Sequence, residues 1–158
     1  MPKVENDRAR ELEKALYANI PIAASMGARA MTVSDERVAL SAPLGPNTNH
    51  ANTAFGGSVY SVAVLSRWAL ASETARAAGL DCDYIVVQDG EIDYLLPVAS
   101  DFTAEASWLK PGDREKFVAM LGRKGRARAT LESQVKAGGV VCAKLRARFA
   151  AQLKKDAN

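Results

Sequence analysis

The chain has 158 residues, of which 48% are hydrophobic and 25% charged, and its 21 lysines and arginines against 18 acidic residues give a net charge of +3. These values are close to the averages for globular proteins, which excludes collagen-like, low-complexity and disulfide-rich scaffolds. This length predicts one domain over residues 1–158. The small positive charge permits anionic ligands, but it gives no reason to expect nucleic acid as a partner.

The chain has two cysteines, Cys82 and Cys142, and one histidine, His50. They form no cluster of the kind that binds zinc, so we expect no metal and no cofactor. We expect free thiols in a reducing compartment, and therefore the cytoplasm. The first residues show no secretory signal. The most apolar stretch, residues 53–72, is interrupted by Arg67 and by several glycines and serines, so we expect no membrane span.

The first third of the chain predicts a helix, a hairpin and a loop. Within residues 1–19, apolar residues at helical spacing predict a helix over 5–18, which Ile20-Pro21 ends. Residues 26–42 predict a hairpin that turns at 34–36, because apolar and polar residues alternate in its second arm. Residues 43–52 are dense in proline, glycine and asparagine and predict a loop.

A long central helix is predicted over residues 53–79. Asn52 or Thr53 is expected to cap it, and Gly79 to end it. Its first two-thirds are apolar nearly all round, which indicates a helix buried on most sides. The charged residues of the predicted helix are Arg67, Glu73 and Arg76.

The rest of the chain predicts strands over 84–94, 102–108, 126–135 and 141–149, a short helix or turn over 111–122, and a hairpin turn at Gly138-Gly139. Strands on both sides of one buried helix indicate an α+β fold. We expect a curved antiparallel sheet of five to six strands wrapped round that helix.

The segment 47–58, Asn-Thr-Asn-His-Ala-Asn-Thr-Ala-Phe-Gly-Gly-Ser, leads from a polar loop into the central helix through two glycines. A helix N-terminus has free N–H groups and a positive dipole end, and glycines let a carbonyl come close. Such a site can stabilise an oxyanion. The alternative is a capped helix whose glycines only allow close packing on the sheet. The chain has no GxSxG, GxGxxG or Walker A motif.

Several motifs together resemble the hot-dog thioesterases, and among them the YiiD C-terminal family. The matching pieces span roughly residues 15–150. They are Ile20-Pro21, Met26-Gly27, Ala42-Pro43-Leu44, Pro46-Asn47-x-Asn49, Thr53-Ala-Phe-Gly-Gly-Ser58, Asp89-x-x-Ile92-x-Tyr94-x-x-Pro97 with Asp101-Phe102, and Arg123-Lys-Gly-Arg126.

The resemblance implies the hot-dog fold and a thioesterase acting on acyl thioesters of coenzyme A or of acyl carrier protein. It also implies a homodimer, with a tetramer left open, in which strand 84–94 joins two sheets edge to edge. The site then lies at the dimer interface. Two alternatives remain: a hydroxyacyl-thioester dehydratase that uses His50 with a carboxylate of the second copy, or a non-catalytic module that binds acyl thioesters.

The resemblance assigns the N–H of Gly57 to the thioester carbonyl, and it assigns substrate binding to Thr53, Phe55 and Gly56. Ser58 either contacts the substrate or water, or it satisfies the helix backbone. Asn47 and Asn49 either orient the acyl group or water, or they shape the loop.

The chain departs from its relatives at Val64, where many of them carry a carboxylate two turns into the helix. His50 and Asp89 are the candidate replacements, because Glu73 lies about 24 Å along the helix from Gly57. The working mechanism is a water that Asn49 and Ser58 hold and that Asp89 or His50 activates.

A basic run is expected on or near a strand, at Lys110, Arg123, Lys124, Arg126 and Arg128, with Arg146 and Arg148 on the neighbouring strand. Arg123, Lys124 and Arg126 are the candidates for binding the phosphates of a pantetheine ligand or an acidic carrier protein. The alternative is a solvated sheet face. We expect Val59, Val62, Ala63 and Leu65 to line an acyl site, and Trp68 and Trp108 to lie in the core.

Overall fold

The computed structural model describes residues 3–155, and the side chains of the first helix from Asp7 onward. Residues 1–2 and 156–158 of the predicted domain lie outside the described residues. The elements in chain order are α1 (Lys3–Asn19), α2 (Ile22–Ser25), β1 (Arg29–Val33), β2 (Arg37–Ala42), the 3-10 turn η1 (Gly45–Asn47), α3 (Gly56–Ala77), β3 (Cys82–Tyr94), β4 (Phe102–Trp108), α4 (Asp113–Lys124), β5 (Arg126–Ala137) and β6 (Val140–Leu153).

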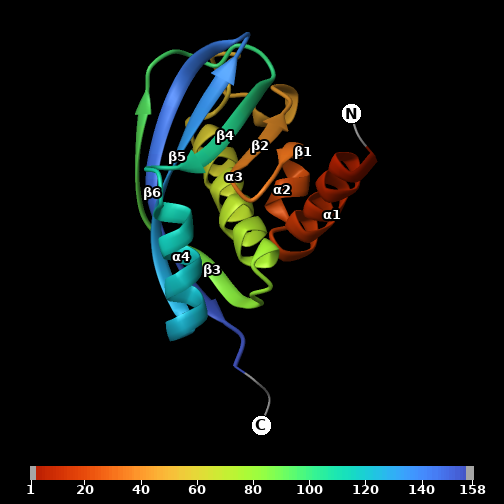
Figure 1. Ribbon diagram of the computed structural model, residues 1–158. Coiled ribbons are helices and arrows are strands. Elements are labelled where there is room, and N and C mark those ends of the chain that lie inside the picture. The colour runs from red at the N-terminus through yellow and green to blue at the C-terminus, as the bar shows by residue number, and fades with distance from the viewer. Residues whose placement is uncertain (1–2, 156–158) are drawn as a thin grey trace.

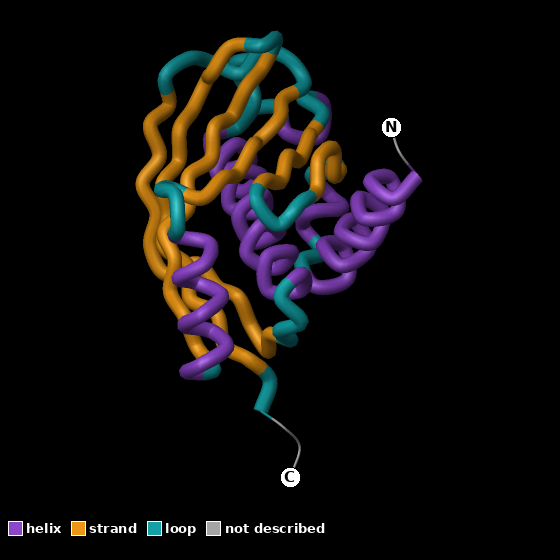
Figure 2. The backbone as a smooth tube through the Cα atoms, viewed as in Figure 1, coloured by secondary structure: helices purple, strands orange, loops and turns teal. Residues whose placement is uncertain are grey.

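The strands form one six-stranded sheet in the order β1-β2-β4-β5-β6-β3, and every neighbouring pair is antiparallel. The sheet curves round α3, while α1 and α2 lie on the opposite side of that helix (Figure 1; Figure 2). This confirms the predicted hot-dog fold, a curved antiparallel sheet wrapped round one long helix.

Strands β5 and β6 follow from their alternating sequence. Every second residue of β5 from Ala127 to Val135 is buried or half-buried against the core, and the residues between them are exposed or half-buried. The two strands turn at Gly138 and Gly139, whose φ angles of 57° and 78° favour glycine. One face of the hairpin therefore packs toward α3 and the other meets solvent.

The central helix begins three residues later than predicted. Its N-cap is Phe55, which makes no side-chain cap, and its last helical residue is Ala77, with Ala78 as the C-cap. Gly79 follows at a left-handed φ of 71°, as predicted for the glycine that ends the helix. Asn52 and Thr53 do not cap it, because Asn52 has a left-handed φ of 59° and Thr53 is bonded to the side chain of Asn49 within the loop. Between residues 3 and 155, no helix is long and apolar enough to cross a membrane.

The two edges of the sheet differ. Strand β1 has five residues and packs against α1, where the Glu13 carboxylate accepts a hydrogen bond from the Ala30 N–H at 2.9 Å. Strand β3 has 13 residues, and among the described strands it pairs only with β6. It carries the exposed apolar side chains of Tyr84, Val86 and Val87, so a long edge remains open for pairing.

Candidate active site

The start of α3 presents N–H groups without acceptors. The first bond into this turn is donated by the Val59 N–H to the Phe55 carbonyl at 3.0 Å. Within the described chain, the N–H groups of Gly56, Gly57 and Ser58 have no acceptor, and the first turn holds no acidic residue. This positive helix end can therefore receive an anion or a polarised carbonyl.

Both glycines at this turn are closely approached. A Cβ on Gly56 would lie 3.3 Å from the Tyr94 hydroxyl oxygen, which itself donates a hydrogen bond to the Gly56 carbonyl at 2.8 Å. A Cβ on Gly57 would lie 2.3 Å from the exposed ring of Phe55. Tyr94 thus fixes the helix start against the end of β3, and burial, helped by Tyr60, raises the pKa of the Tyr94 hydroxyl.

The loop before α3 is held by its asparagines. Asn47 is buried, and its amide donates to the carbonyls of Met26 and Pro43 at 2.8 and 2.7 Å. The Asn49 side chain accepts from the N–H groups of Ala51 and Thr53 and donates to the Thr53 hydroxyl. These bonds match the loop-shaping alternative for both asparagines, since they use the amide donors of each side chain.

The two candidate bases, His50 and Asp89, lie on different elements of the fold. His50 is exposed on the same loop as Asn49. Asp89 is exposed and forms an ion pair with Arg148, its partner in register on β6. The next residue, Gly90, faces Tyr60 of α3, so the Asp89 side chain points to the other, outer face of the sheet. Within one chain, the structure does not bring Asp89 to the start of α3.

The basic residues are more dispersed than predicted. Arg123 and Lys124 lie in the last turn of helix α4, and Arg126 begins β5. All three are exposed, and none forms an ion pair with a described residue. Arg148 and Arg146 instead lie opposite acidic residues of β3. The exposed arginines of β5 and β6 lie on neighbouring strands, as predicted, and acidic residues of β3 lie beside those of β6.

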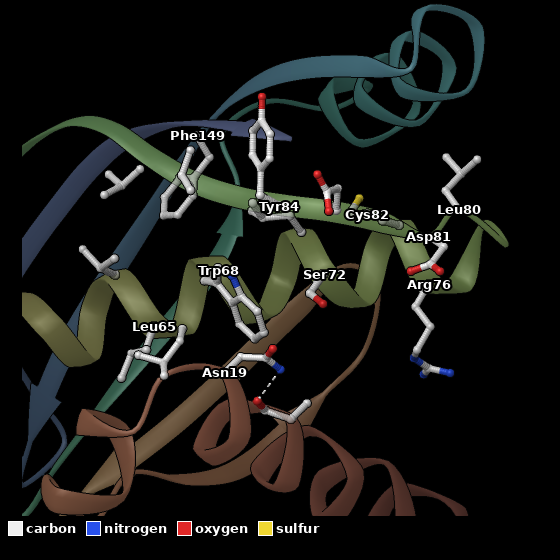
Figure 3. A pocket seen from close by; sticks show the side chains of 18 of the residues that line it. Asn19, Leu65, Trp68, Ser72, Arg76, Leu80, Asp81, Cys82, Tyr84 and Phe149 are labelled. Carbon is white, nitrogen blue, oxygen red and sulfur yellow. Dashed lines mark hydrogen bonds between the residues drawn. The ribbon is translucent and has the colours of Figure 1, made fainter. Parts of the chain in front are cut away.

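A pocket of about 1070 Å³ lies between α3, β3 and the end of α1. Figure 3 shows Trp68 and Ser72 projecting into it from α3, with Asn19 of α1 opposite Trp68. Apolar groups dominate its wall along α3, while Arg76 and Asp81 lie toward its far end. Of the residues predicted from sequence to form the site, Leu65 lines this pocket, and none of the predicted catalytic or phosphate-binding residues does.

The pocket uses a different face of α3 from the one predicted. Val59, Val62 and Ala63 are fully packed in the core and do not reach the pocket, whereas Leu65 does. Trp68 is half-buried and lines the pocket instead of lying wholly in the core. The end of the sheet at β3 decides which face of α3 lines the pocket. The sequence of a helix that is apolar nearly all round does not show which face that is.

Tyr60 lines the pocket, although no sequence pattern predicted it there. Of the four tyrosines, Tyr17, Tyr84 and Tyr94 each donate a hydroxyl hydrogen bond to a protein acceptor. Tyr60 lines the pocket, and its hydroxyl has no such bond within residues 3–155. A Cβ on Gly90 would lie 2.5 Å from the hydroxyl oxygen. A glycine inside a strand signals a close approach of this kind.

Arg67 belongs to α3, and its side chain is fully buried between that helix and the sheet. Its Nε donates to the Ser133 hydroxyl at 2.8 Å and its Nη2 donates to the Leu145 carbonyl. In the described chain, Nη1 is buried without a partner and no carboxylate forms an ion pair with the group. Burial, partly opposed by Tyr60 and Glu132, lowers the pKa of Arg67 to about 9, which leaves it charged at neutral pH.

A hot-dog sheet round a helix with an uncapped N-terminus, beside an apolar pocket, defines the class of this protein as hot-dog thioesterase-like. A sequence model of the family described as "Putative thioesterase (yiiD_Cterm)" matches residues 9–153. The chain belongs to this family.

Solved structures agree with this assignment. A protein from Shewanella oneidensis described as a "putative thioesterase" is 26% identical, with a TM-score of 0.80 over 93% of this chain and 98% of its own. A Pseudomonas aeruginosa protein described as a "Probable Thioesterase" is 25% identical, with a TM-score of 0.74 over 92% and 96%. A Chlorobaculum tepidum protein of unknown function is 25% identical, with a TM-score of 0.87 over 95% and 97%.

Proposed function

We propose that the protein hydrolyses acyl thioesters of coenzyme A or of acyl carrier protein. The observation that carries the proposal is the start of α3, where three neighbouring N–H groups have no acceptor among the described residues. They lie one helical turn before Tyr60 and Ser61, which line a mainly apolar pocket. N–H groups of this kind stabilise the negative charge that develops on a carbonyl oxygen. Membership of a thioesterase family supports the same reaction.

In the proposed reaction, the thioester oxygen lies at the N–H of Gly57 and the acyl chain enters the pocket beside Leu65 and Trp68. Ser58 lies at the helix start, and its hydroxyl has no bond to a described residue, so it is free to hold a water. His50, exposed on the loop that leads into α3, is the candidate general base of this chain. Asp89 would have to come from a second copy, because in its own chain it faces away from α3.

We expect the wild-type protein to release free thiol from acyl-CoAs with an optimum in chain length, because the mainly apolar pocket has a limited volume of about 1070 Å³. The G57V variant should lose about 100-fold in kcat/KM, since its side chain would occupy the space that the carbonyl needs. The measurement is chromatographic detection of free CoA over short, long and aromatic acyl groups. It avoids thiol reagents, which half-buried Cys82 could consume.

The matched control is G45V. Gly45 lies in η1, close in sequence to the site, and a Cβ there would meet nothing within 4 Å. Wild-type and G45V proteins should turn over alike. No release from acyl-CoAs, followed by none from acyl carrier protein thioesters, would contradict hydrolysis. Binding without turnover would then favour the non-catalytic module, and loss of water from a hydroxyacyl thioester would favour the dehydratase.

A further inference from the structure

We propose that Tyr60 is a catalytic residue, and that its hydroxyl donates a hydrogen bond to the thioester carbonyl oxygen beside the N–H groups at the start of α3. This inference rests on the proposed thioesterase function and names a second oxyanion donor for it.

The first observation is position. Tyr60 follows Gly57 by three residues and precedes Val64 by four, so the three share one face of α3. Val64 occupies the place where the resemblance expects a carboxylate, and its side chain can neither accept nor donate a proton. Ser61, the other polar residue of this turn, donates its hydroxyl to the Gly57 carbonyl at 2.7 Å. The hydroxyls of Ser58 and Tyr60 are thus the ones left without a bond to a described residue on this part of the helix, and of these two residues Tyr60 lines the pocket.

The second observation is the state of that hydroxyl. The hydroxyls of Tyr17 and Tyr94 are bonded to backbone carbonyls at 2.6 and 2.8 Å. The Tyr60 hydroxyl lies in the wall of the pocket and has no acceptor among residues 3–155. A half-buried donor of this kind gains a hydrogen bond when a ligand supplies an acceptor.

The third observation is that the surroundings make room for this hydroxyl and place positive charge near it. Gly90 leaves the space that a Cβ would take 2.5 Å from the hydroxyl oxygen. Arg67 lies seven residues further along α3 and contributes a buried charge without a carboxylate partner in the described chain. A positive charge near a phenol strengthens its hydrogen bond to an oxygen that becomes negative.

The reaction that Tyr60 assists needs no further reagent. Water attacks the carbonyl carbon and a C–O bond forms, while the carbonyl oxygen takes the negative charge and accepts hydrogen bonds from Tyr60 and the Gly57 N–H. The C–S bond then breaks with its electron pair on sulfur. The products are a carboxylate and a thiol. Of the two protons of the water, one passes to the sulfur and the other to solvent. Tyr60 keeps its proton throughout.

The test compares Y60F with Y17F, each of which loses one phenolic hydroxyl. Y60F should lower kcat about 100-fold, with KM within about threefold and an unchanged melting temperature, because the Tyr60 hydroxyl bonds to no described residue. Y17F should show the opposite pattern, with a lower melting temperature and wild-type kcat, since it loses the bond to Ala28. Equal kcat for Y60F and the wild-type protein would overturn the proposal.

Gly90 provides a second test. G90A should lower kcat in the wild-type background by displacing the Tyr60 hydroxyl, and it should have little further effect on kcat when combined with Y60F. Additive losses in kcat would contradict the proposed contact.

Binding separates this inference from the function on which it rests. A ketone analogue of an acyl-CoA keeps the carbonyl and a thioether analogue lacks it, so Y60F should weaken binding of the ketone alone, by about 10-fold. Equal weakening of both would refute the carbonyl contact. A wild-type protein that neither binds nor turns over any acyl thioester would instead remove the proposed function.

Discussion

R67A is expected to lower the free energy of unfolding by about 3–5 kcal/mol, and R67M by no more than about 1.5 kcal/mol. Arg67 is fully buried, and its guanidinium bonds to the Ser133 hydroxyl and the Leu145 carbonyl. Alanine leaves a cavity under α3 and removes the donors of both bonds. Methionine fills most of that volume and removes the cost of burying a charge, which offsets the lost hydrogen bonds.

The measurement is urea unfolding followed by tryptophan fluorescence, at one fixed protein concentration because assembly would shift the midpoint. The control is R76M on the same helix. Arg76 is exposed, and its buried partner Glu73 keeps an ion pair with Arg8, so the loss of Arg76 should cost under about 1 kcal/mol. If R67M were as costly as R67A, the hydrogen bonds and not the packed volume would be what holds the helix on the sheet.

Local patterns predicted the architecture because the strands bury one face. Alternating side chains along 126–135 and 141–149, joined by Gly138-Gly139, predicted the β5–β6 hairpin, and the structure confirms it. The edge position of the strand after the central helix was implied by family resemblance, and β3 occupies that edge. The hairpin depends on residues close in sequence, and the edge position depends on motifs that span most of the chain.

The site was harder to predict, because it depends on contacts between distant segments. Asn52 and Thr53 have the chemistry of helix caps, yet the Asn49 side chain holds Thr53 in the loop. The pocket face of α3 is set by the end of the sheet at β3. Two sequence signals were nevertheless present: Arg67 is a lone charge in an apolar helix, and Gly90 is a glycine inside a strand. Arg67 marks the place where α3 bonds to the sheet, and Gly90 marks the close approach of the Tyr60 hydroxyl.

The open edge of β3 suggests how the site is completed. It combines a 13-residue unpaired edge with exposed valines and tyrosines, and one side of the pocket is formed by the same strand. Edges of this kind are usually covered in native proteins. The opposite edge, β1, is short and packed against α1. We therefore propose that a second copy pairs along β3 and that the pocket is closed at this interface.

V86K/V87K should convert the protein from a dimer to a monomer and reduce thioesterase activity more than about 100-fold. In a two-fold pairing of β3 whose axis passes beside residues 86 and 87, the new charges of one copy face those of the other, and like charges opposite one another oppose pairing. Analytical ultracentrifugation should give twice 16.9 kDa for the wild-type chain and 16.9 kDa for the variant. The control is M31K/V140K, which adds the same charges at exposed apolar residues outside β3 and should remain dimeric and active. A wild-type monomer with full turnover would show that one chain holds the complete site, and a tetramer that survives V86K/V87K would place the main interface away from β3.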